Sequence, residues 1–254
     1  MQTMSKLLAI VPAYNESGAI AATVTDVLDN APGFDVVVVN DGSTDDTAAL
    51  ARAAGAAVIH HPFNIGIGGA VQSGYQYALD HDYDVAVQVD GDGQHDARYI
   101  PELLAMLRSD PRLNMVSGSR FIGEGEAGYQ SSATRRVGIR FFSGILSRLT
   151  GRAVTDPTSG FRMTDRLGIE LFARDYPHDY PEVEAVLMLH HHRLVAAEVP
   201  VRMRERSTGE SSINSGRSVY YMIKVLLAIL LGLLRTRPTV ESGDAAPVTA
   251  EHSL

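Results

Sequence analysis

Short apolar runs alternate with helical stretches over the first 120 residues, and this alternation restricts the fold more than any other feature. The runs predict strands at Leu7–Val11, Val36–Asn40, Ala57–His60, Val85–Val89 and Met115–Gly118. Helices are predicted between them at Ser17–Asn30, Asp45–Ala54, Gly68–His81 and Ala97–Ser109. Runs such as VVVV are apolar throughout, which is typical of strands covered on both faces. The pattern predicts an α/β domain with a mostly parallel, doubly wound sheet flanked by helices.

Three polar clusters each follow a predicted strand directly. AYNES follows the first strand, DGSTDD the second and DGDGQ the fourth. In open α/β sheets, ligands bind at the carboxyl ends of the strands. We therefore expect these three loops to meet at one edge of the sheet and to form the functional site.

The second half of the chain is less regular. Residues 135–152 put four apolar side chains on one helical stripe amid five arginines, namely Val137, Phe141, Ile145 and Leu149. DPTSGFR (156–162) is turn-like, and the pattern then predicts a helix at Glu182–His192, a strand near Leu194–Val199 and a helix at Arg217–Leu234. We expect a catalytic domain over 1–216, an apolar helix over 217–235 that docks on a membrane or partner, and a disordered tail over 236–254.

Charge and composition exclude several classes of protein. The absence of cysteine rules out disulfides, thiolate metal sites and a cysteine nucleophile, and it suits a cytoplasmic location. Residues 1–128 hold 17 acidic and 6 basic residues, which argues against a nucleic-acid groove in that half. Residues 129–254 hold 13 acidic and 16 basic residues and suit a phosphate or an anionic membrane surface.

The stretch QVDGDGQHD crowds Asp90, Asp92 and Asp96 behind an apolar run. An EF-hand calcium loop is excluded, because its sixth and twelfth positions would be His95 and Pro101 in place of glycine and glutamate. The two remaining interpretations are a solvated turn and a site in which carboxylates and the neighbouring glutamine ligate Mg²⁺ or Mn²⁺ together with a substrate diphosphate. Glycines between the acids would let a bulky ligand approach the backbone.

Two further motifs allow a structural and a functional interpretation. In NDGSTDDT, Ser43 and Asp46 fit a capping signature for the next helix, whereas Asp41 is not needed for a cap and could bind a nucleobase or ribose. The stretch FNIGIGGAVQSG lacks the dinucleotide spacing, because position 71 is valine, and no Walker lysine follows. Gly68 and Gly69 would instead let a helix begin close to the sheet or to a ligand.

Eight motifs in this order and spacing resemble the family 2 glycosyltransferases of GT-A fold: VPAYNES, VVVVNDGSTDDT, NIGIGGAVQSG, VQVDGDGQHD, GSRF, DPTSGFR, YPEVE and RERSTGESSI. The resemblance runs from about Leu7 to Arg235 and is closest to dolichyl- or polyprenyl-phosphate sugar synthase-like enzymes. It implies an inverting transfer of a hexose from a nucleotide diphosphate sugar.

The resemblance also implies roles for individual residues. Those matching the family's donor-binding positions are Pro12, Tyr14, Asn15, Glu16, Asp41, Gly69, Asp90 and Gly91. Asp92 and Gln94 match the pair that ligates the divalent metal. Four arginines stand in motif-like contexts that suit paired phosphate oxygens, namely Arg120, Arg135, Arg162 and Arg206, and Ser211 lies in the same loop as the last of them.

A catalytic base is required only for one kind of acceptor. A hydroxyl acceptor needs a carboxylate to take its proton, and Asp156 and Glu182 are the candidates, with Arg162 beside them in the motif. Glu182 could equally be a helix N-terminal charge. A lipid phosphate is already ionised and needs no base, so Asp156 would then orient other groups.

Neither histidine run earns a site assignment, and the C-terminal apolar helix is too short for a membrane span. His190, His191 and His192 point in different directions on a helix, and His60 and His61 end a strand. Residues 219–234 would extend about 24 Å, short of the roughly 30 Å hydrocarbon layer. They suit an interfacial helix or a docking site for a small membrane partner protein. The alternatives are a helix that covers the core and a homodimer interface.

The favoured function is a hexosyltransferase that acts on a polyprenyl phosphate or lipid-linked glycan at the inner membrane face. A sugar-1-phosphate nucleotidyltransferase is disfavoured, because VPAYNESG carries no arginine after the first strand. A sugar-nucleotide-binding subunit without catalytic activity, part of a membrane glycan assembly complex, remains the other alternative.

Overall fold

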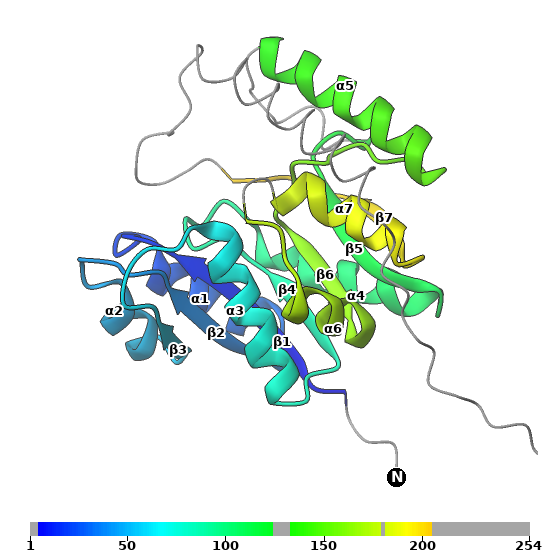
Figure 1. The fold of residues 1–254 in the computed structure, drawn as a ribbon. Helices are drawn as coiled ribbons and strands as arrows, with labels where there is room; N and C mark the ends of the chain where they lie inside the picture. The colour runs from blue at the N-terminus through cyan, green and yellow to red at the C-terminus, as the bar shows by residue number, and fades with distance from the viewer. Residues whose placement is uncertain (1–4, 124–132, 179–180, 205–254) are drawn as a thin grey trace, which may run out of the picture.

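A computed structural model describes residues 5–123, 133–178 and 181–204 (Figure 1). The strands are β1 (Leu7–Ala13), β2 (Phe34–Asn40), β3 (Ala57–His60), β4 (Val85–Gln88), β5 (Leu113–Ser119), β6 (Arg162–Asp165) and β7 (Val195–Pro200). The helices are α1 (Ile20–Asn30), α2 (Thr47–Ala53), α3 (Ile67–Asp80), the 3₁₀ turn η1 (Ala97–Tyr99), α4 (Ile100–Ser109), α5 (Ala133–Thr150), α6 (Arg166–Arg174) and α7 (Pro181–His191).

The strands form one sheet in the order β3-β2-β1-β4-β6-β5-β7. β1 pairs in parallel with β2 and with β4, and β3 is parallel to β2. β6 runs antiparallel to both of its neighbours, whereas β7 at the edge is parallel to β5. The predicted mostly parallel α/β sheet is confirmed.

Helices cover both faces of the sheet and enclose two apolar cores. Alternate residues of β1 point to opposite faces, so that Val11 joins the core beneath α1 and α4, while Ile10 joins the core beneath α3, α6 and α7. Both side chains have no exposed surface. This two-sided burial explains why the strand sequences are apolar without alternation.

β6 and α6 were not predicted, because DPTSGFR was interpreted only as a turn. β6 has four residues and α6 begins directly after it, so neither leaves a long periodic signal. The stripe predicted on 135–152 is also partly wrong. α5 buries Ile139, Phe142 and Leu146, whereas Phe141 is 53% exposed. The buried face therefore follows a mixed three- and four-residue spacing instead of the strict four-residue one.

The predicted helix at 217–234, the tail at 236–254 and the boundary at 216 lie outside the described residues. Within the described ranges, no helix combines the length and the apolar character needed to cross a membrane.

Two mid-helix glycines should respond in opposite ways to alanine. A Cβ at Gly74 in α3 would lie 2.2 Å from Ile10 Cγ2, whereas one at Gly144 in α5 would meet only Arg148 Nη1 at 3.7 Å. We expect Gly74→Ala to lower the free energy of unfolding by about 1–3 kcal/mol through overpacking. Gly144→Ala should raise it by up to about 1 kcal/mol, because alanine favours a helix. Urea denaturation followed by circular dichroism measures both, and equal effects would contradict the packing argument.

Candidate active site

The carboxyl ends of β1, β2 and β4 lie side by side at one edge of the sheet. β1 is the middle strand of the three, and Ala13 at its end is in register with Asn40 at the end of β2. The three polar loops predicted to form the site therefore follow neighbouring parallel strands, as expected.

Hydrogen bonds clip the loop after β1 to the loop after β2. The Asn15 N–H donates to Ser43 Oγ, and Asn15 Oδ1 accepts from the Thr44 N–H, both at 2.9 Å. The Glu16 N–H donates to Thr47 Oγ1 at 2.9 Å. Asn15 has a φ of 54°, a left-handed conformation that asparagine tolerates better than most residues. The loops after β1 and β2 thus form one unit.

Pro12 and Gly91 bring the β4 loop against the end of β1. The Gly91 N–H donates to the buried Pro12 carbonyl at 3.2 Å, and a Cβ at Gly91 would lie 3.0 Å from that oxygen. Tyr14, two residues further on, is 48% exposed. The ring of Tyr14 is therefore accessible to a ligand, while Pro12 shapes the loop from below.

The cap of α2 differs from the prediction. Asp46 precedes the helix without a side-chain capping bond, and Ser43 binds the β1 loop instead. Asp45 supplies the capping hydrogen bond, because its Oδ1 accepts from the Thr47 N–H at 3.0 Å. Partial desolvation opposes ionisation of Asp45, but hydrogen bonds from Thr47 and Ser17 outweigh it and lower its pKa to about 2.

Asp41 is buried at the end of β2 and holds the loop that leads into α3. Its Oδ1 accepts from the Ile65 N–H at 3.0 Å and its Oδ2 from the Gly66 N–H at 2.9 Å. His61 Nδ1 lies 2.8 Å from Asp41 Oδ1, and His61 Nε2 lies 2.9 Å from Ser73 Oγ. Asp41 therefore has a structural role in addition to the predicted contact with the nucleoside, which stays a prediction.

His61 is the residue of this cluster that the sequence analysis missed. β3 pairs in parallel with β2 so that His60 is in register with Asn40. The next residue of each strand, His61 and Asp41, consequently meet at the same edge. The register of β3 would have revealed the pair, but four residues of strand do not determine a register from sequence.

The glycines that begin α3 make room for protein atoms. A Cβ at Gly69 would lie 2.6 Å from Ile65 Cδ1, and one at Gly68 would lie 2.4 Å from the Pro177 carbonyl. The groups that approach these glycines closely are therefore residues of the chain itself. The predicted contact of Gly69 with the nucleotide sugar stays a prediction.

The acidic loop after β4 separates into two groups. Asp90 Oδ1 accepts from Gln88 Nε2 at 3.1 Å, and Asp92 Oδ1 accepts from the Gln94 N–H at 3.0 Å. Asp96 instead belongs to an ion-pair network, with Arg204 Nη2 at 2.7 Å from its Oδ1. Burial would raise the pKa of Asp96, but the hydrogen bonds of Arg98 and the charge of Arg204 lower it below its ordinary value.

The donor set of this loop fits a divalent cation that also binds a diphosphate. Asp90 and Asp92 carry carboxylates and Gln94 an amide oxygen, which are ligands that Mg²⁺ and Mn²⁺ accept. In the part of the chain that the structure describes, no group of three or more His, Asp or Glu side chains gathers as a metal site. Substrate oxygens would therefore have to complete the coordination.

Arg120 and Asp156 form a buried, bidentate ion pair across the loops after β5 and before β6. Arg120 Nε lies 2.6 Å from Asp156 Oδ2, and Nη2 lies 2.8 Å from Oδ1. Thr158 Oγ1 also donates to Asp156 at 3.1 Å. Burial would raise the pKa of Asp156, but hydrogen bonds and the charge of Arg120 hold it below its ordinary value. This geometry favours a positioning role for Asp156 over proton abstraction.

Arg162 begins β6 and is 2% exposed. Its Nε donates to the Ser159 carbonyl at 2.7 Å and its Nη2 to the Glu182 carbonyl at 2.5 Å. Nη1 is buried and has no hydrogen-bond partner within the described ranges. The Glu182 carboxyl lies in the first turn of α7, where burial raises its pKa against the opposing charge of Arg162.

Gly160 joins these residues to the acidic loop. A Cβ at this position would lie 3.0 Å from Gln88 Nε2 and 3.3 Å from Asp90 Oδ2. The DPTSGFR loop thus packs directly on the end of β4, and the structure brings Arg162 to the acidic loop. Arg135 lies in α5, but its side chain is not described, and the positions of Arg206 and Ser211 lie outside the described residues.

A family model for glycosyl transferase family 2 matches residues 8–171, more than half of the chain. The chain is also 31% identical over 220 residues to an undecaprenyl-phosphate mannosyltransferase of Micrococcus luteus, covering 83% of this chain and 88% of the relative. This protein belongs to glycosyl transferase family 2. The predicted family and enzyme class are confirmed.

Other relatives of this family 2 glycosyltransferase carry related names. A polyprenol monophosphomannose synthase of Mycolicibacterium smegmatis is 29% identical, covering 87% of this chain and 85% of the relative. A solved glucosyl-3-phosphoglycerate synthase of Mycobacterium tuberculosis, in complex with Mn²⁺, UDP and glucosyl-3-phosphoglycerate, superposes with a TM-score of 0.68 at 20% identity. That match covers 90% of this chain and 80% of the other, and it confirms the GT-A-like fold.

The Arg120–Asp156 pair gives a stability prediction. Asp156→Asn should lower the free energy of unfolding by about 3–5 kcal/mol, because it leaves the Arg120 charge buried and unpaired. The difference should shrink below pH 3.8, the ordinary pKa, because the carboxylate stabilises only while ionised and is protonated as pH falls through its lowered folded-state pKa.

Asp110→Asn is the matched control, because it removes a similar bidentate pair with Arg112 that is exposed to solvent. Urea denaturation at pH 7 and at pH 3–4 measures both variants. Equal losses in the two variants at pH 7 would show that the buried pair contributes nothing special.

Proposed function

We propose that this glycosyltransferase is metal-dependent and transfers a hexose, with inversion, from a nucleotide diphosphate sugar to a polyprenyl phosphate. The observation that carries the proposal is the packing of Gly160 on Asp90, which sets the acidic loop beside Arg162 and Glu182 at the strand ends. Both substrates of such a transfer, the nucleotide diphosphate sugar and the polyprenyl phosphate, are anionic. A cation held by carboxylates, with guanidinium groups beside it, suits both of them.

The donor would lie along the three loops. Its base and ribose would contact Tyr14, Asn15, Glu16 and Asp41, and its diphosphate would reach Asp90 and the acidic loop. The exposed ring of Tyr14 and the clipped β1 and β2 loops support a preformed cleft for the nucleoside. The Mn²⁺ and UDP of the solved M. tuberculosis enzyme support the same kind of donor.

Asp92 and Gln94 would hold Mg²⁺ or Mn²⁺ together with the diphosphate oxygens. The bound cation supplies Lewis acidity that neutralises the departing diphosphate. Arg120 lies in the loop after β5, where Asp156 fixes its guanidinium and balances its charge. Arg162 has one buried N–H group without a partner, which suits a substrate oxygen.

A lipid phosphate is the acceptor that the relatives favour. The M. luteus and M. smegmatis relatives are named for undecaprenyl phosphate and polyprenol monophosphomannose, and a Haloferax volcanii relative, 30% identical, for dolichyl phosphate. An ionised phosphate attacks without losing a proton, so no carboxylate base is required. Asp156 would then position Arg120, and Glu182 would stay near Arg162 without taking a proton.

The site of action would be the inner face of the cell membrane. α5 supports this, because Phe141 is exposed on a helix rich in arginine. The segment 217–235 would dock on the membrane, on a small membrane partner or on a second copy of the chain, with 1–216 as the catalytic domain and 236–254 as a tail.

The choice of acceptor can be tested with two lipids that differ only in the head group. Purified full-length protein with Mn²⁺ and a panel of UDP- and GDP-hexoses should transfer sugar to undecaprenyl phosphate and not to undecaprenol. A general base contributes about 10²–10⁴-fold, so Glu182→Gln should keep kcat within about tenfold on the phosphate. Transfer to undecaprenol alone, or a larger loss in Glu182→Gln, would refute the proposed acceptor chemistry. Donor binding with no transfer to either lipid would favour a binding subunit without catalytic activity.

Removal of the metal ligand gives a second test. Asp92→Ala should lower kcat by about two orders of magnitude or more, because the cation supplies several kcal/mol of charge stabilisation. It should also abolish the Mn²⁺ dependence of donor binding measured by isothermal titration calorimetry. Asp29→Ala changes an exposed aspartate of α1 and should leave both quantities unchanged. Full Mn²⁺-dependent activity in Asp92→Ala would remove the metal role.

A further inference from the structure

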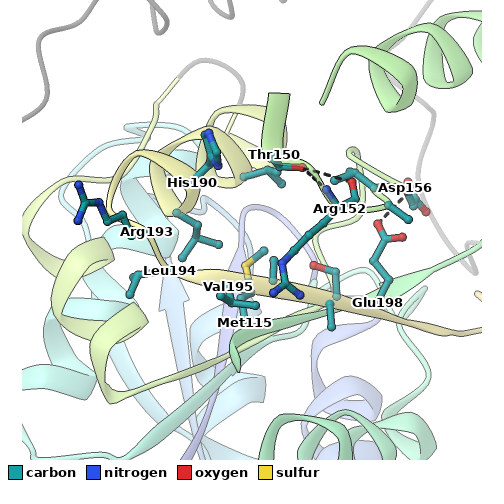
Figure 2. Close-up of a pocket in the computed structure, with 16 residues that line it drawn as sticks. Met115, Thr150, Arg152, Asp156, His190, Arg193, Leu194, Val195 and Glu198 are labelled. Carbon is teal, nitrogen blue, oxygen red and sulfur yellow. Dashed lines mark hydrogen bonds between the residues drawn. The ribbon is translucent and has the colours of Figure 1, made fainter. Parts of the chain in front are cut away.

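A cavity lies between α7, the end of α5 and the strands β5 and β7 (Figure 2). Its volume is about 280 Å³. Most of the wall is apolar and includes Met115, Val154, Val186 and Leu189. The nucleotide loops after β1, β2 and β4 contribute no residue to this wall, so it is a place apart from the donor site.

Two arginines, Arg152 and Arg193, line the cavity. Arg152 is an exposed residue of the loop after α5, and its side chain lines the cavity with the guanidinium near Met115 and Val195 (Figure 2). That guanidinium makes no hydrogen bond and no ion pair with any other residue in the described ranges. Asp110, which senses the charge of Arg152, is already held in a bidentate pair by Arg112.

Two acidic side chains of the wall bear on which ligand can bind to Arg152. Asp156 and Glu198 lie together at one end of the cavity (Figure 2). Asp156 is paired with Arg120, and Glu198 accepts from the Thr155 N–H at 2.8 Å and the Asp156 N–H at 3.1 Å. Both acids are therefore engaged by the chain, whereas the Arg152 donors are available.

The contents of the wall point to the chemistry of a ligand. A guanidinium binds one carboxylate or phosphate through two N–H groups, and the apolar wall would cover a short hydrocarbon. A volume of about 280 Å³ suits a short alkyl chain with its head group. A complete polyprenyl chain is too large for it.

We propose that this cavity is a binding site for a small anionic amphiphile, with the head group on Arg152 and a short chain against Met115 and Val186. The site does not depend on the proposed donor or acceptor. It adjoins the active site through Asp156, which lines the cavity and also pairs with Arg120.

Binding of octyl phosphate to the full-length protein, measured by isothermal titration calorimetry without donor, tests the proposal. Octyl phosphate should bind saturably and about tenfold or more tightly than octanol, which lacks the charge, and than inorganic phosphate, which lacks the chain. Octanoate in parallel distinguishes a phosphate from a carboxylate head. Affinity no greater than that of octanol or inorganic phosphate would overturn the proposal.

Three variants locate the bound molecule. Arg152→Met keeps the apolar stem and should weaken octyl phosphate binding about tenfold or more. Ala196→Leu, which fills the wall from β7, should weaken it as well, whereas Arg148→Met on α5 should leave it within about twofold because Arg148 does not line the cavity. Unchanged binding in Arg152→Met would show that the ligand binds elsewhere. These experiments measure binding and not sugar transfer. A negative binding result would therefore leave the proposed function unaffected, and a negative transfer result would leave this proposal unaffected.

Discussion

The parallel pairing of β1 with a neighbour on each side is the constraint on which the site depends. It brings the ends of β1, β2 and β4 to one edge in register, and the two apolar cores that cover β1 hold that arrangement in place. The loops themselves are rich in polar residues. They are ordered by hydrogen bonds to each other, such as Asn15 to Ser43 and Gly91 to Pro12, which form only when the strand ends are adjacent.

Acidic side chains at this edge are tolerated because each is matched separately. Asp41 and Asp45 accept backbone N–H groups, Asp96 pairs with arginines, and Asp156 is held by Arg120. At the acidic loop, Asp90 accepts from the Gln88 amide and Asp92 accepts from the Gln94 N–H group, and both of these donors are neutral. Neutral donors stabilise a carboxylate without cancelling its charge. The cation proposed at this loop would add a positive charge to these contacts.

The long periodic elements and the strand-end loops could be predicted from sequence because they carry strong local signals. The strands up to β5 and the helices up to α4 were predicted to within a few residues, as was the position of the acidic loop. β6, α6 and the His61–Asp41 contact could not be predicted, because they depend on pairing between distant short segments. The α2 cap shows the same limit, since Ser43 and Asp45 both suit capping and only the contact with Asn15 decides between them.

The surroundings of Asp156 and Glu182, the two candidate bases, shift their pKa values in opposite directions. Hydrogen bonds and the charge of Arg120 lower the pKa of Asp156, while burial raises the pKa of Glu182 beside Arg162. Groups pushed in opposite directions serve different purposes. Asp156 therefore suits the fixing of the Arg120 guanidinium, whose charge it balances. A hydroxyl acceptor would require proton uptake by Glu182, whose carboxylate form would also face the negative charge of Asp90. The proposed phosphate acceptor needs no such proton transfer, so the raised pKa of Glu182 places no constraint on it.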